Sequence, residues 1–183
     1  MKIVILDRDG VINEDSPDFI KSIVEWRPIP GSLEAIALLC QAGYRVFIAS
    51  NQSGIGRGLL DFDALFAIHE HLQRAVAELG GRIDGIEFAP EHPDHSSDKR
   101  KPGPGMLKDL ARRLQISLDG VPFVGDSISD LEAARAAGAR PVLVLSGNGI
   151  RTKKMLSLPE ADIYDDLMAF ARTQIARGAN VVA

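Results

Sequence analysis

Two carboxylates follow directly on an apolar run near the start of the chain, in the stretch VILDRDGVIN at residues 4–13. Asp7 ends the apolar run, and Asp9 and Gly10 come two and three positions later. A short, β-branched apolar run is typical of a strand that is buried on both faces of a sheet. The pattern therefore predicts two acids at the end of a buried strand, where carboxylates can attack, bind a cation or move a proton.

Three further polar groups stand at comparable places farther along the chain. Ser50 ends the stretch YRVFIAS, Lys101 stands in DKRKPGPG before a helical pattern, and Asp126 ends VPFVGD. In an open parallel sheet, ligands bind beyond the carboxyl ends of the strands. We therefore expect separate segments to bring acids, a hydroxyl and a lysine to one edge, a coincidence that the fold alone does not explain.

This combination fits phosphoryl transfer through an aspartyl-phosphate. Two like charges about 4 Å apart repel by about 4 kcal/mol at an effective dielectric constant near 20, so a carboxylate that attacks a phosphate needs cations. Asp7 and Asp126 supply the hard oxygen ligands that Mg²⁺ prefers, Lys101 neutralises further charge, and Ser50 donates to a phosphate oxygen. Asp9 then protonates the leaving oxygen and later activates water.

The remaining apolar patterns predict the elements that position these groups. Strands are expected at residues 2–6, 44–49, 83–88, 121–124, 140–145 and, most weakly, 161–164. Helical patterns lie between them, in the stretches at residues 32–42, 61–81, 103–115, 129–138 and 165–178. The alternation predicts an α/β fold, a three-layer doubly wound parallel sheet, as a single domain over residues 1–183 without a cap domain.

Composition narrows the possible functions. The chain is 45% hydrophobic and 25% charged, as in an ordinary soluble globular protein. A net charge of −4 argues against a nucleic-acid partner, and no apolar run approaches the roughly 20 residues that span a membrane. A single cysteine, Cys40, excludes an internal disulfide framework. Without a signal-peptide pattern at the N-terminus, we expect a cytoplasmic protein, and without an obvious oligomerisation segment we expect a monomer.

Four stretches of the sequence resemble a known family. LDRDG, SNQSG, RKPGPGM and VGDSISD are similar, in order, to the four motifs of the haloacid dehalogenase-type phosphatases. The resemblance spans nearly the whole chain and is closer to the subgroup with heptose bisphosphate and histidinol phosphate phosphatases. DRDGVIN, NQSGIGRG and KPGPGM favour the heptose branch. The expected partner is therefore a small phosphorylated sugar.

The resemblance implies a role for each motif. It makes Asp7 the nucleophile and Asp9 the acid/base, with Mg²⁺ held by Asp7, the Asp9 carbonyl and Asp126. Ser50 and Lys101 hold the phosphate that is transferred. Around the substrate the resemblance places a further set of residues, namely Asp15, Asp18, Asn51, Gln52, Ser53 and Arg100.

One loop departs from the subgroup. Many members bind structural zinc through a Cys-x-His and a Cys-x-Cys before the lysine motif, but this chain has Ala89 and Glu91 at the first pair and Ser97 and Lys99 at the second. We therefore predict no structural zinc, and a loop ordered by its prolines and local hydrogen bonds. Gly103 also replaces a histidine that is common in the lysine motif.

Without a cap, loops must select the substrate. Arg57 and Arg100 are the residues best suited to a second anionic group, because guanidinium matches phosphate oxygens. His92 and His95 flank an acid but lack a further strong metal ligand, so we expect no metal there. His69 is expected to be an ordinary surface or boundary residue.

Other functions remain open from the sequence. Histidinol phosphate phosphatase is the alternative within the enzyme class. A phosphoacceptor signalling module also pairs acids with a hydroxyl and a lysine, although the order DxDG and the late GDxxxD favour turnover. Asp130, in the last motif, is expected to cap or orient the site without binding metal directly. An inactive binding protein is disfavoured because each expected catalytic residue is present.

Overall fold

A parallel sheet forms the centre of the molecule in the computed structural model, which describes residues 1–95, 97–155 and 161–179. Its strands lie in the order β3-β2-β1-β4-β5-β6, and every neighbouring pair is parallel. The strands are β1 (Lys2–Leu6), β2 (Tyr44–Asn51), β3 (Gly85–Ala89), β4 (Pro122–Gly125), β5 (Arg140–Val144) and β6 (Asp162–Tyr164). The order reverses direction at β1, where ligands of such sheets commonly bind.

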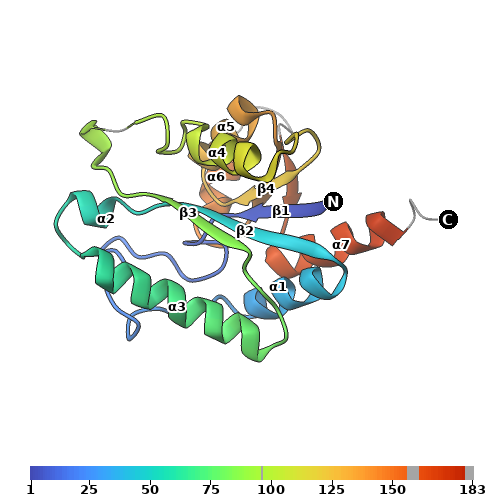
Figure 1. Cartoon of the computed structure of the whole chain (residues 1–183), viewed down its shortest axis with the longest axis horizontal. Helices are drawn as coiled ribbons and strands as arrows, with labels where there is room; N and C mark the ends of the chain where they lie inside the picture. Colours follow the sequence, from blue (N-terminus) through green and yellow to red (C-terminus); the bar gives the residue numbers. More distant parts are fainter. Residues whose placement is uncertain (96, 156–160, 180–183) are drawn as a thin grey trace.

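Helices cover both faces of the sheet (Figure 1). They are α1 (Ser32–Gln41), α2 (Ser53–Gly56), α3 (Phe62–Glu78), α4 (Gly105–Leu114), α5 (Ile128–Ala137), α6 (Gly149–Met155) and α7 (Leu167–Ala179), with a 3₁₀ turn at Pro93–His95. In Figure 1, α1, α3 and α7 lie below the sheet and α4 and α5 lie above it. The sheet is therefore the middle of three layers, and the predicted α/β class is confirmed.

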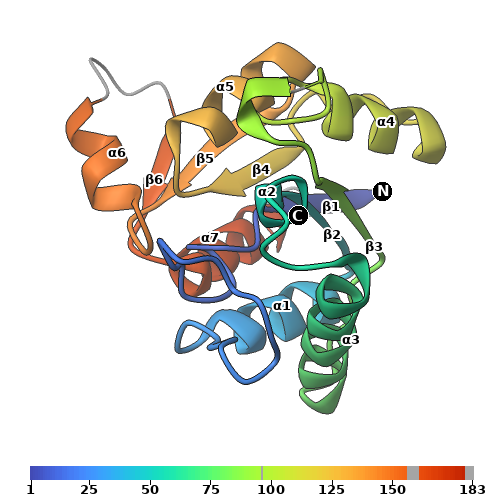
Figure 2. The same cartoon turned by 90° about the vertical axis from the view of Figure 1, so that its left-hand side faces the viewer.

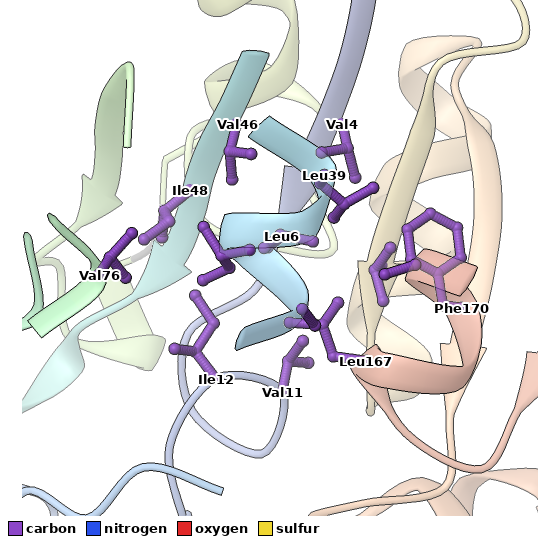
Figure 3. Close-up of a cluster of buried hydrophobic side chains, with 14 of the residues drawn as sticks. Val4, Leu6, Val11, Ile12, Leu39, Val46, Ile48, Val76, Leu167 and Phe170 are labelled. Carbon is purple, nitrogen blue, oxygen red and sulfur yellow. The ribbon is translucent and has the colours of Figure 1, made fainter. Parts of the chain in front are cut away.

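The two faces of β1 build two separate cores. Val4 and Leu6 point into the cluster between the sheet and helices α1, α3 and α7, part of which Figure 3 shows. Ile3 and Ile5 point to the opposite face and pack with α4 and α5. Successive side chains of a strand point to opposite faces, so a run of apolar residues is needed where both faces are covered. This burial fixes the position of the residue that follows β1, which is Asp7.

Local signals explain where two of the helices begin. The Asp61 carboxylate accepts a hydrogen bond of 2.8 Å from the Ala64 N–H at the start of α3. In α5, Ser127 and Asp130 form a capping box, in which each side chain accepts from the other's backbone N–H. These caps satisfy N–H groups that have no partner within the helix.

The predicted strands and long helices are confirmed, with ends that differ by one to three residues at most positions. Sequence patterns did not predict α2 and α6, because both are short and lack a regular apolar stripe. Between β1 and α1, and between β3 and α4, the described chain forms loops and turns, as expected for a fold without a cap. Among the described residues no helix combines the length and hydropathy that a membrane span requires.

Candidate functional site

The carboxyl ends of β1, β2 and β4 meet at one edge of the sheet, which faces the viewer in Figure 2. A pocket of about 200 Å³ opens at this edge. Most of the predicted site residues line it, namely Asp7, Asp9, Asp15, Ser50, Asn51, Gln52, Lys101 and Asp126. A pocket of this volume holds one polar group of a ligand, and the rest of a larger ligand would extend beyond the pocket opening.

Lys101 lines this pocket and is almost fully buried. Its Nζ lies 2.8 Å from Asp7 Oδ1 and 2.6 Å from Asp130 Oδ1, and it donates to the Ala49 carbonyl at 3.0 Å. Burial lowers the pKa of Lys101, but the charges of Asp130 and Asp7 outweigh it and raise the pKa above its usual value. The ammonium group therefore stays charged beside the first acid of the chain.

Three buried acids face each other around this lysine. Oxygen atoms of Asp7, Asp126 and Asp130 all lie within 4.8 Å of one another. Burial raises the pKa of Asp7 well above its usual range; Lys101 opposes that shift, and Asp130 and Asp126 add to it. Burial and the neighbouring Asp130 likewise raise the pKa of Asp126 to about 7. Hard oxygen ligands with excess negative charge are the donor set that suits Mg²⁺.

Asp130 has a second set of contacts that ties it to the protein. Its Oδ2 accepts hydrogen bonds from the N–H groups of Asp126, at 3.2 Å, and Ser127, at 3.0 Å. Its other oxygen lies against Lys101. The expectation that Asp130 caps or orients the site without binding metal directly stays a prediction, and these contacts support its first part.

Asp9 lies in a different environment, surrounded by hydrogen-bond donors. Arg8 donates to both of its carboxylate oxygens at 3.0–3.1 Å, Asn13 donates to Oδ1 at 2.8 Å, and Gln52 donates to Oδ2 at 2.9 Å. Burial raises the pKa of Asp9, but the charge of Arg8 and the hydrogen bonds of Asn13 and Gln52 together lower it below its usual value. The carboxylate is thus held in one orientation at the pocket wall.

Gln52 connects Asp9 to the end of β2. Its Nε2 donates to Ser50 Oγ at 2.9 Å as well as to Asp9, and its Oε1 accepts from Arg8 at 3.1 Å. Because Ser50 accepts this bond through its oxygen, its hydroxyl hydrogen remains to donate into the pocket. Gln52 therefore orients other side chains of the site.

Asn51 holds the lysine segment in place. Its Nδ2 donates to the Lys101 carbonyl at 2.9 Å, and its Oδ1 accepts from the Lys101 N–H at 3.0 Å. These two bonds join β2 to a loop that lies 50 residues away in sequence. They explain how a residue that precedes α4 reaches the end of β1.

Some predicted substrate residues lie outside the pocket. Asp18 is exposed, and Ser53 is buried in the first turn of α2. Arg57 ends α2, with its guanidinium 5.8 Å from the centre of the Phe19 ring. Arg100 is partly buried, and burial and the charge of Arg57 lower its pKa. The two guanidinium groups are therefore close enough to repel each other.

Sequence reasoning missed several residues of the pocket wall, including Arg8, Phe19, Ser129 and Asn148. Phe19 has a positive φ of 63°, which is unusual for a bulky side chain and has no signature in the sequence. Asn148 could have been found, because the polar stretch SGNG follows the fifth predicted strand at the same edge of the sheet.

The loop that departs from the zinc-binding subgroup is ordered by hydrogen bonds. Ser97 Oγ donates to Glu91 Oε1 at 2.7 Å and accepts from the Lys99 N–H at 3.1 Å. His92 Nδ1 accepts from the Asp94 N–H at 3.2 Å. Glu91, Ser97 and Lys99, which the resemblance aligns with zinc-ligand positions, are thus joined by direct hydrogen bonds in this chain.

His69 differs from the expectation of a surface or boundary residue. It is buried, with only 6% of its area exposed, and its ring lies edge-on to Phe88. Burial, aided by the charge of Arg8, lowers its pKa to about 4. His69 lies four residues after Leu65 and three before Leu72, so it shares the buried face of α3, and the helical spacing could have placed it there.

Comparison with known proteins agrees with this geometry. Residues 99–169 match the model of a family described as HAD-hydrolase-like. The chain is 54% identical over 176 residues to a D-glycero-beta-D-manno-heptose-1,7-bisphosphate 7-phosphatase of Pseudomonas putida, covering 96% of this chain and 100% of that protein. An enzyme of the same name from Pseudomonas aeruginosa is also 54% identical, over 92% of this chain and 95% of its own.

A solved structure is similar over almost the whole fold. The crystal structure of D,D-heptose 1,7-bisphosphate phosphatase from B. bronchiseptica, complexed with magnesium and phosphate, superposes with a TM-score of 0.94. It is 49% identical in sequence, over 97% of this chain and 99% of that chain. The likeness therefore extends to the loops that surround the pocket.

Proposed function

Because the chain belongs to the HAD-like hydrolases, in the family of D-glycero-beta-D-manno-heptose-1,7-bisphosphate 7-phosphatases, we propose that it removes the 7-phosphate from that heptose bisphosphate. The observation that carries the proposal is the contact of Asp7 with Lys101 beside the buried Asp126, with Asp9 held separately at the same pocket. One acid is placed to attack, and another is placed to move a proton.

In the first step, a carboxylate oxygen of Asp7 attacks phosphorus and the bond from phosphorus to the sugar oxygen breaks. The bound phosphate dianion favours the protonated form of Asp9, which gives its proton to that oxygen, so the sugar leaves as an alcohol. In the second step, Asp9 takes a proton from water, which attacks the acyl phosphate and releases inorganic phosphate. The free Asp7 carboxylate is restored. Arg8, Asn13 and Gln52 keep Asp9 oriented through both steps.

Mg²⁺ is the cofactor in this proposal. Asp7, Asp126 and the backbone carbonyl of Asp9 would hold it, while Asp130 remains with Lys101. When bound, the ion offsets the repulsion between the Asp7 carboxylate and the phosphate dianion. Lys101 adds a fixed positive charge, and the Ser50 hydroxyl donates to a phosphate oxygen.

The phosphate that is not cleaved lies at Arg57 and Arg100 in this proposal. Nη1 of Arg100 is buried and without a hydrogen-bond partner among the described residues, which is costly for a charged group. The nearby Arg57 adds repulsion. A phosphate between the two guanidinium groups would supply acceptors and cancel this repulsion. Asp15 and Asn51 border the pocket toward the sugar, and Asp18 and Ser53 lie farther out.

The protein acts, in this proposal, as a cytoplasmic monomer with one domain over residues 1–183. The continuous sheet and its two cores support the single domain, because every strand is paired with a neighbour in sheet order. Sedimentation of the purified protein tests the monomer.

Phosphate release from a substrate panel with Mg²⁺ tests the function. The panel contains the β-heptose 1,7-bisphosphate, the 7-monophosphate and histidinol phosphate. We expect the bisphosphate to give the highest kcat/KM. Preference for histidinol phosphate would replace the substrate assignment, and a long-lived phosphoprotein without turnover would indicate a signalling module. Arg100→Ala should reduce the preference for bisphosphate over monophosphate by about tenfold, which corresponds to about 1.4 kcal/mol; an unchanged preference removes Arg100 from the substrate site.

A further inference from the structure

The segment after β5 closes on the acid-rich side of the pocket, although it contains none of the four motifs. The Asn148 N–H donates to Asp126 Oδ2 at 2.7 Å. The Asn148 side chain donates through Nδ2 to Asp15 Oδ2 at 3.0 Å and to Asp126 Oδ2 at 3.3 Å. Thr152 donates to the Asp126 carbonyl at 2.7 Å. Both the side-chain carboxylate and the backbone carbonyl of Asp126 therefore accept hydrogen bonds from this one segment.

The same segment lies directly against the backbone that follows β1. Ser146 Oγ donates to the Gly10 carbonyl at 2.8 Å. Gly147 has a positive φ of 56°, and a Cβ added there would lie 2.3 Å from Asp126 Oδ2 and 2.5 Å from Gly10 Cα. Only glycine allows such an approach. The backbone is therefore shaped to bring Asn148 to the carboxylate.

The two carboxylate oxygens of Asp126 differ in their hydrogen-bond partners. Among the described residues, the hydrogen bonds to this carboxylate end at Oδ2. Oδ1 is then the oxygen whose lone pairs remain for a cation. Asn148 also joins this carboxylate to Asp15, an exposed acid that borders the pocket from the loop after β1.

We propose that Asn148 is a positioning residue that fixes Asp126 for the divalent cation and ties it to Asp15 at the mouth of the pocket. This role rests on the proposed function, because it concerns the same cation and the same substrate. The Asn148 side chain joins Asp126, which would contact the cation, to Asp15, which would contact the substrate. Ordering of one segment therefore favours ordering of the other, so that cation binding and substrate binding assist each other.

Calorimetric titration of Mg²⁺ into the substrate-free protein tests the first half of this role. Asn148→Ala removes the side-chain donor and keeps the backbone N–H. We therefore expect Mg²⁺ affinity to fall by about tenfold, which is the smaller end of the loss seen when a group that orients a metal ligand is removed. Asn148→Ser keeps one donor and should recover part of the affinity. Thr173→Ala is the matched control, because it removes a side-chain hydrogen bond to Ala169 on α7, outside the pocket lining.

A double-mutant cycle with Asp15→Ala tests the second half. At saturating Mg²⁺, Asn148→Ala and Asp15→Ala should each raise KM by about three- to tenfold, with a change in kcat below about threefold. The double variant should resemble the single ones, because each removes the same bridge. Independent, multiplicative effects on KM would contradict the bridge.

The outcomes distinguish the two proposals. If the wild-type protein releases phosphate but Asn148→Ala and Asn148→Ser bind Mg²⁺ as tightly as wild type, the role of Asn148 is wrong and the phosphatase proposal stands. If the wild-type protein hydrolyses none of the substrates while Asn148→Ala still weakens Mg²⁺ binding, the phosphatase proposal fails and the effect on the cation stands. Loss of folding in Asn148→Ala, judged by thermal unfolding, leaves Asn148→Ser to decide between these results.

Discussion

Asp7 and Asp9 stand two positions apart in sequence, yet their surroundings shift their pKa values in opposite directions. Burial raises the pKa of Asp7; Lys101 opposes that shift, and the neighbouring Asp130 and Asp126 add to it. Asp9 faces an arginine and two amide donors, and its pKa is lowered. Like charges are concentrated around the first acid, whereas the second is already neutralised by the protein. Of these two carboxylates, only Asp9 receives enough positive charge and hydrogen bonds from the protein to outweigh the effect of burial on its pKa.

This difference supports the proposed separate roles of the two carboxylates without reference to relatives. A group of buried acids that share one lysine is stabilised by an added cation, and a carboxylate fully supplied with donors is not. Pairs of titratable groups with oppositely shifted pKa values are frequent where one group binds or attacks and the other transfers a proton. The predictions below test the contrast, from the largest expected effect to the smallest.

Asp7→Asn should abolish turnover, with a fall in kcat of at least about 10⁴-fold, because the amide cannot form the acyl phosphate. Without Mg²⁺ the variant should unfold at a higher temperature than wild type, since a neutral side chain costs less to bury and relieves repulsion with Asp130 and Asp126, which together outweigh the lost attraction to Lys101. Phosphate release and thermal unfolding measure the two effects. Asp119→Asn, at an exposed acid outside the pocket lining, is the control. Retained activity in Asp7→Asn would remove this residue as the nucleophile.

Arg8→Met should lower kcat by about 10- to 100-fold, because Asp9 loses its cationic partner and its fixed orientation. The pKa of Asp9 rises when the positive charge is removed, so the pH above which Asp9 is ionised moves upward. The decline of kcat with rising pH, which reports Asp9 in the substrate complex, should therefore begin at a higher pH. Arg74→Met, which breaks an exposed ion pair with Glu70 on α3, should leave the profile unchanged. An unaltered profile in Arg8→Met would contradict the contrast with Asp7.

Stability should fall as the pH drops from about 6.5 to 4, in part because of His69. Its pKa is lowered from 6.5 to about 4 in the folded state, so the unfolded chain takes up the proton first and unfolding is favoured in that interval. The loss from this residue is at most about 3 kcal/mol. Denaturant unfolding across the interval should show a weaker pH dependence in His69→Leu than in the control His95→Asn, at an exposed histidine. Equal slopes would show that His69 is not a buried neutral base.

Asp61→Ala should lower the free energy of unfolding by about 1 kcal/mol and leave Mg²⁺ affinity unchanged. Unlike Asp7 and Asp9, which line the pocket, Asp61 is exposed to solvent, and its carboxylate caps α3. Asp63→Ala, in the same helical turn, removes the same charge without the cap and should cost less. Denaturant titration compares the two variants. Equal costs would mean that the helix dipole, and not the cap, carries the effect.

The sequence was sufficient for the groups that end buried strands. Asp7, Ser50 and Asp126 follow apolar runs, and parallel strands bring their carboxyl ends to one edge, so their convergence could be predicted. Lys101 was predictable as a cation before a helix. The bonds of Asn51 that carry it there depend on side-chain contacts between distant segments.

Other parts of the site depend on local geometry that no periodic pattern encodes. Arg8 follows Asp7 directly, and only the turn after β1 directs its guanidinium onto Asp9. The positive φ of Phe19 is set by a turn in an irregular loop. The helix α6 has too few apolar positions to be recognised, and its Thr152 is buried because it bonds to Asp126. Contacts of this kind are determined by tertiary structure.

The closure of Asn148 and Thr152 on Asp126 has a consequence for biosynthesis. A nascent chain that ends before β5 can already pair β1 with β2 and β4, because those strands precede it in sequence. It lacks the core residues of β5 and α7 as well as the donors that hold Asp126, so an incomplete translation product should be inactive. Enzymatic activity would then appear late in synthesis, once residues well beyond the last recognisable motif have left the ribosome.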